Sequence, residues 1–129
     1  MITLKDVREF LKTKIDCDNW YSSKIDASKE KCIGIYNIQG GKPYIALGGI
    51  DNTSYSSKVI SILVHWTNNS NTAELKAQEV YNALFGQTGI IGGHKVIMFD
   101  MKTDEPVSVG ADSKGIFEYV INLTITYER

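Results

Sequence analysis

The stretch that decides the fold is the last one, FEYVINLTITYER (residues 117–129), in which every second side chain from Phe117 to Tyr127 is apolar. A period of two over this length predicts a β-strand with one buried face. The intervening Glu118, Asn122 and Thr124 turn the other face to water or to a partner. We therefore expect the chain to end inside its own sheet, with no appended catalytic module.

A second stretch, Lys58 to Trp66, is apolar on both faces, which predicts a strand in the middle of the sheet. Glycine pairs and prolines separate the other apolar runs, as is typical of hairpins and loops. The remaining expected strands are long ones at Lys31–Ile38 and His94–Met101 and short ones at Tyr44–Leu47 and Val107–Val109.

Two helices are expected. Thr3 caps the first, whose apolar side chains recur at steps of three and four from Leu4 to Ile15. Asn71 and Glu74 predict a capping box for the second, which ends before Gly86. Because only one helix lies between strands, we expect a single α+β domain over residues 1–129. Its antiparallel or mixed sheet has about four to five strands, with two main helices packed on one face.

The composition excludes several classes of protein. The chain of 129 residues carries 14 Lys plus Arg against 15 Asp plus Glu, so no excess charge draws it to nucleic acid or to an anionic membrane. Its longest apolar run, residues 59–66, is far shorter than the roughly 20 residues that span a bilayer. No secretory signal precedes the first helix, and we expect a cytoplasmic protein with Cys17 and Cys32 as free thiols.

No catalytic, metal or cofactor site is predicted. The glycine-rich residues 86–95 follow a helix and precede a strand, the reverse of a phosphate-binding loop, and His94 stands before Lys95. The acidic residues of the late turns, from Asp100 to Asp112, favour solvated turns over a cation site. A small enzyme that uses His65 or His94 with an acidic partner stays an alternative, although no nucleophile motif accompanies either histidine.

Tyrosines in or near the turn-rich segments are candidate anchors of a protein interface. Tyr36, Tyr44 and Tyr55 are the three concerned. Tyrosine offers a large contact area at a low entropy cost. No basic stripe is interleaved with the aromatic residues Tyr44, Tyr55, Trp66, Tyr119 and Tyr127, as it is in proteins that bind single-stranded nucleic acid.

From Ile33 onward the chain resembles a known family. The resembling pieces are Gly34-Ile35-Tyr36 with its glycine-rich turn, the strand at residues 59–66, the helix at residues 73–85 and the closing strand with its Tyr-Glu-Arg end. In these pieces the chain resembles the minor capsid, or tail terminator, family of tailed bacteriophages, which joins head to tail.

The resemblance implies a structural virion protein and no reaction. Subunits of this kind form a ring, a hexamer, on the head-proximal end of the tail tube, in the tail or neck of a virion assembled in the host cytoplasm. The implied partners are the tail tube protein and the head-tail connector or neck protein, with no membrane, no cofactor and no sequence-specific contact to DNA passing through the ring. A head-completion or neck protein of similar fold is the alternative.

Loop length places the contacts of such a ring in two polar turns, residues 48–57 and 102–115. In these turns and the nearby strands we expect six interface residues, which are Tyr36, Tyr44, Tyr55, Lys58, Lys102 and Asp104.

Overall fold

The computed structural model describes residues 1–26, 28–40, 43, 45–50 and 54–129. They form two helices, α1 (Leu4–Lys12) and α2 (Ser70–Leu84), and seven strands. The strands are β1 (Trp20–Ser22), β2 (Cys32–Asn37), β3 (Tyr55–His65), β4 (Gly89–Ile91), β5 (His94–Met101), β6 (Val107–Ala111) and β7 (Phe117–Glu128). Neither helix is long and apolar enough to cross a membrane.

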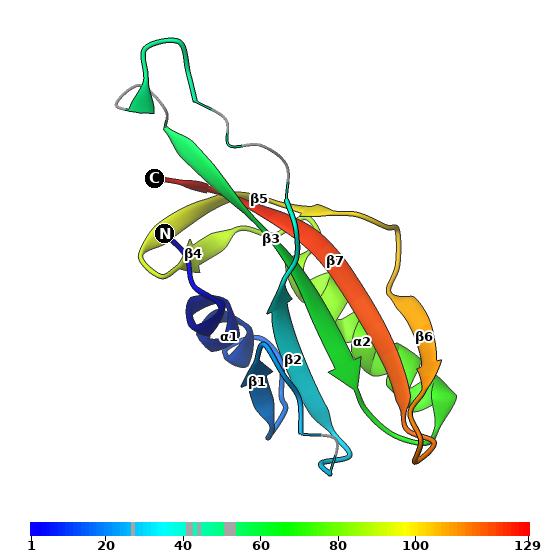
Figure 1. Cartoon of the computed structure of the whole chain (residues 1–129). Helices are drawn as coiled ribbons and strands as arrows, with labels where there is room; N and C mark the ends of the chain where they lie inside the picture. Colours follow the sequence, from blue (N-terminus) through cyan, green and yellow to red (C-terminus); the bar gives the residue numbers. More distant parts are fainter. Residues whose placement is uncertain (27, 41–42, 44, 51–53) are drawn as a thin grey trace.

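All seven strands belong to one mixed sheet, in the order β1-β2-β3-β7-β5-β4, with β6 paired to β7 beside β5 (Figure 1). Strand β1 runs parallel to β2, and the other pairs are antiparallel. The two strands with the clearest sequence patterns, β3 and β7, pair over eleven residues at its centre. The α+β class and the central position of β3 are therefore confirmed.

The predicted count of about four to five strands is wrong, because β1 and β4 form where no strand was expected. Each has only three residues and exists because a longer strand, β2 or β5, offers a partner. The predicted strand at residues 44–47 is also wrong for its described part. Ile45 pairs with no strand, and Leu47 lies in a turn that the Gly49 N–H closes on the Ala46 carbonyl at 2.8 Å.

One core joins both helices to one face of the sheet. Alternate residues of β3 and β7 point to this face in matched register, Ile60 opposite Leu123 and Ile62 opposite Ile121. The buried side chains of α1 and α2 belong to the same cluster, among them Leu4, Val7, Leu11, Ala73, Ala77, Val80, Tyr81 and Leu84. The helices therefore lie on one face, as expected, and the face that they leave uncovered is called the open face below.

The helix ends follow local chemistry. The Thr3 side chain accepts the Asp6 N–H at 3.1 Å while the Asp6 carboxylate accepts the Thr3 N–H at 2.9 Å, a complete capping box. The cap of α2 is Asn69, which accepts the Thr72 N–H at 3.0 Å, and not the predicted Asn71. Asn69 is the N-cap because it directly precedes the first turn of the helix. After α2, Gly86 takes the left-handed conformation expected of a helix stop.

Between β2 and β3 the chain leaves the sheet as an arm. We use this name for its described residues, 38–40, 43, 45–50 and 54. Figure 1 shows the arm projecting beyond the start of β3, away from both helices. The end of β7 lies at the base of the arm, where the Arg129 N–H donates to the Ser54 carbonyl at 3.0 Å. The arm is thus anchored to the sheet at its base and carried beyond it at its tip.

Candidate functional site

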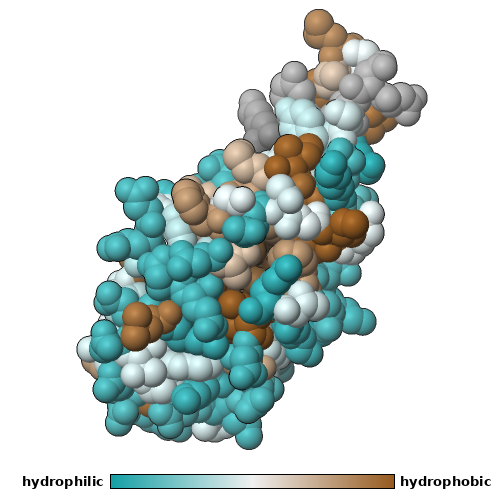
Figure 2. Space-filling view, turned by 180° about the vertical axis from the view of Figure 1, so that it is seen from behind, coloured by the Kyte–Doolittle hydropathy of each residue, from teal (hydrophilic) through white to brown (hydrophobic). Residues whose placement is uncertain are grey.

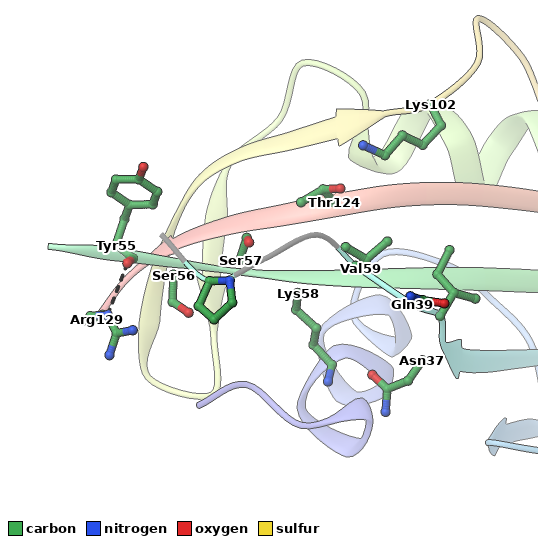
Figure 3. Close-up of a pocket in the computed structure, with 13 residues that line it drawn as sticks. Asn37, Gln39, Tyr55, Ser56, Ser57, Lys58, Val59, Lys102, Thr124 and Arg129 are labelled. Atoms are coloured by element: carbon green, nitrogen blue, oxygen red, sulfur yellow. Dashed lines mark hydrogen bonds between the residues drawn. The ribbon is translucent and has the colours of Figure 1, made fainter. Parts of the chain in front are cut away.

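A groove of about 690 Å³ opens at the base of the arm, and it contains three of the predicted interface residues. Tyr55 and Lys58 reach it from the start of β3, and Lys102 reaches it from the end of β5 (Figure 3). The other lining residues come from the arm base, β2, β3 and β7, and they are Asn37, Ile38, Gln39, Gly40, Pro43, Ser56, Ser57, Val59, Thr124 and Arg129.

Among the described residues that line the groove, the charged side chains are all cations. Its charged residues are Lys58, Lys102 and Arg129. The Arg129 Nε donates to the Tyr55 carbonyl at 3.1 Å, whereas Lys102 Nζ lies 3.8 Å from the Asp100 carboxylate in an exposed pair that contributes little. In Figure 3, Lys58 points away from β7 while Lys102 lies on the other side of β7, so the two side chains do not point toward one another. The cations form an extended positive rim and do not converge on one anion.

The structure does not bring the other predicted interface residues into this groove. Tyr36 lies on the open face of β2, opposite Ser61, and burial raises the pKa of its hydroxyl. Asp104 lies in the turn after β5 and lines a different groove. Tyr44 falls outside the described residues. The predicted set is therefore divided between two grooves and the open face.

The groove that contains Asp104 is apolar at its α2 side. It measures about 570 Å³ and lies between the end of α2 and β5. The Tyr81 hydroxyl donates to the Thr103 carbonyl at 2.7 Å, and its ring stacks on Phe85 with centroids 5.7 Å apart. Phe85 and Met98 are both exposed. Sequence reasoning missed these two, because Phe85 was taken for the last residue of the helix and Met98 for an ordinary strand residue.

The arm exposes large apolar side chains. Leu47 is fully exposed at the turn, and Ile45 and Ile50 beside it are 56% and 51% exposed. Figure 2 shows apolar atoms at the far end of the arm, while most of the body on that side is hydrophilic. A protruding element with an apolar tip is typical of a contact with another protein surface. Loop length predicted contacts in residues 48–57, which include Ile50 but not Ile45 or Leu47.

His65 has a structural role. It is fully buried at the end of β3, where Nδ1 lies 2.8 Å from the Glu30 carbonyl and Nε2 lies 2.8 Å from the Asp112 carboxylate. Both neighbours are acceptors, and the ring links the Glu30 carbonyl to the Asp112 carboxylate, with which it pairs. The hydrogen bond from His65 is the main cause that lowers the pKa of Asp112 to about 2. The pair joins the segment before β2 to the turn after β6.

The remaining reactive groups do not complete an active site. His94 starts β5 and bonds the Glu128 carbonyl at 3.0 Å, so it lies at the opposite end of β7 from His65. Burial raises the pKa of the Cys32 thiol to about 12 and also raises that of Cys17, so neither is an activated nucleophile, and both are free as expected. Within the described ranges no group of three potential metal ligands gathers.

Comparison with known proteins finds a family and a solved structure that are similar to this chain. The model of a family described as bacteriophage tail terminator protein matches residues 8–129. A solved chain from the virion of a native gene transfer agent particle shares the fold with a TM-score of 0.59 and 12% identity, over 96% of this chain and 94% of that one. Among curated proteins no sequence matches this one.

Proposed function

Because the chain belongs to the bacteriophage tail terminator family, we propose that it assembles into a hexameric ring at the head-proximal end of the tail tube. There the ring stops polymerisation of the tube and presents the surface onto which the head connector docks. The protein is a structural component of a phage virion and not an enzyme. The observation that carries the proposal is the family match, which extends over almost the whole chain.

The shape of the subunit supports ring assembly. A ring needs two different surfaces on each subunit, because a head-to-tail contact joins unlike patches. The apolar tip of the arm and the exposed strand β6 are such unlike patches on one chain. Neither is covered by another element of the described chain.

The contacts with the tube and the connector are proposed for the arm base and the turn after β5. Tyr36, Tyr44, Tyr55, Lys58, Lys102 and Asp104 stay the proposed interface residues. The positive rim of the arm-base groove suits an acidic partner surface, since complementary charge steers and orients association. The hydroxyl and amide groups around the rim can form hydrogen bonds to the partner surface, where part of the water is excluded.

The test is electron microscopy of tube protein from the same genome, polymerised with and without this protein. With the protein present, we expect short tubes with a cap at one end only. Tyr55→Asp is expected to give uncapped tubes of uncontrolled length, and Leu75→Asp, on the exposed side of α2, is the matched control that still caps. If tube length does not change when the protein is added, and the protein binds only to connector protein, its role is that of a neck protein and not of a terminator.

A further inference from the structure

We infer that two neighbouring subunits join through the arm of one and the free edge of β6 in the other, with the arm tip packed on Val107 and Val109. The inference rests on the ring-forming part of the proposed function and adds which surfaces meet. The β6 edge is covered by the arm of a second copy of this chain.

Strand β6 is an unprotected edge. Within the described part of the chain it pairs with β7 alone, and all five of its residues are exposed, with Val107 at 44% and Val109 at 53%. Edge strands are usually protected by charges, by an internal proline or by a covering element. Strand β6 carries no charge, and Pro106 precedes the strand and leaves its N–H groups in place.

The backbone direction along β7 shows which groups of β6 are free. The Phe117 N–H donates to the Thr67 carbonyl at 2.9 Å, and its carbonyl accepts the Trp66 N–H at 3.2 Å, so both groups face the β3 side. Directions alternate along a strand, so Tyr119 also faces β3. Ser108, which lies opposite Tyr119, therefore directs its N–H and carbonyl away from β7, toward the free edge.

Side chains on the open face lead to the same edge. Leu63, Val120 and Val107 lie in one row across β3, β7 and β6, and the row ends at Val107 without a further neighbour. An apolar side chain beside Val107 would continue this row and remove its exposed end from water. The arm tip supplies such side chains in Ile45, Leu47 and Ile50.

The two surfaces cannot meet within one chain. Figure 1 shows the arm beyond one end of the sheet and β6 at the opposite end of the molecule. Complementary surfaces that lie apart on one subunit join head to tail, and such contacts close into a ring when the rotation between subunits is right. The partner on the β6 edge is therefore a neighbouring copy.

The test is disulfide trapping between two variants. Leu47→Cys and Val109→Cys are prepared separately in a chain with Cys17→Ser and Cys32→Ala, mixed in equal amounts and oxidised mildly. We expect a cross-linked dimer on a non-reducing gel. The matched control pairs Leu47→Cys with Leu75→Cys, which is exposed on α2, and should give several-fold less dimer. Equal yields from both mixtures, or no cross-link, would overturn the inference.

A second measurement addresses the backbone edge. Ser108→Pro removes an outward N–H while Ser108→Ala keeps it, so the proline variant alone should elute as a monomer where the parent forms rings. Rings that persist with the proline would contradict the contact. Rings that cap tubes but give no cross-link would overturn this inference and leave the proposed function standing. Cross-linked rings that do not cap tubes would overturn the proposed function and leave this inference standing. A protein that is monomeric at every concentration overturns the inference.

Discussion

Leu47→Asp on the arm is expected to prevent ring assembly without weakening the fold. Leu47 is fully exposed and belongs to no part of the core cluster. The substitution therefore removes no apolar area that folding buries, and it buries no new charge in the isolated subunit. The free energy of unfolding should change by no more than about 0.5 kcal/mol, as for an ordinary surface substitution.

The effect on assembly follows from the same exposure. Burying a leucine side chain contributes about 1.5–3 kcal/mol. At about 1.4 kcal/mol per tenfold change, the loss of this contribution raises the dissociation constant of each contact about 10- to 150-fold. A closed ring repeats the contact at every subunit, so the loss recurs around the ring. Rings should disappear at concentrations where the parent protein forms them.

Two measurements on the same samples check this prediction. Light scattering after size exclusion gives the mass over a concentration series, and thermal unfolding gives the stability. Leu75→Asp introduces the same charge on the exposed side of α2 and should match the parent in both. A Leu47→Asp variant that melts several degrees lower would show that the tip belongs to the fold. Unchanged rings would show that the tip makes no contact in them.

Three further predictions concern the fold. Leu123→Ala, at a fully buried position in the middle of β7, should cost about 2–5 kcal/mol in chemical denaturation, and a cost below 1 kcal/mol would show a loosely packed core. Gly34→Val should cost about 1–3 kcal/mol, since even a Cβ at Gly34 would lie 2.6 Å from Ile25 Cγ2, and unchanged stability would show that this segment yields easily. The pKa of Asp112 is lowered from 3.8 to about 2, so its stabilising effect is full above pH 3.8 and is lost as the pH falls toward 2. Between pH 3.8 and 2, the free energy of unfolding of Asp112→Asn should fall less than that of the parent protein. If the two fall equally with pH, the role of the His65–Asp112 pair is refuted.

The sequence by itself determined the elements whose pattern is local. Strand β7 shows a period of two and β3 an apolar run in their own residues, and α1 shows its apolar stripe along the helix and its cap at Thr3. These features depend on neighbours a few residues away, so reading along the chain finds them. The α+β class and the central place of β3 follow from them.

Only the tertiary structure decided the rest. Strands β1 and β4 are three residues long and form because β2 and β5 lie beside them, which no local pattern encodes. The pair of His65 and Asp112 joins residues 47 positions apart, and the arm-base groove joins Tyr55, Lys102 and Arg129 from three separate segments. Contacts of this kind depend on the path of the whole backbone. Periodicity reports only which face of an element is buried, whereas the partner on that face is chosen by packing.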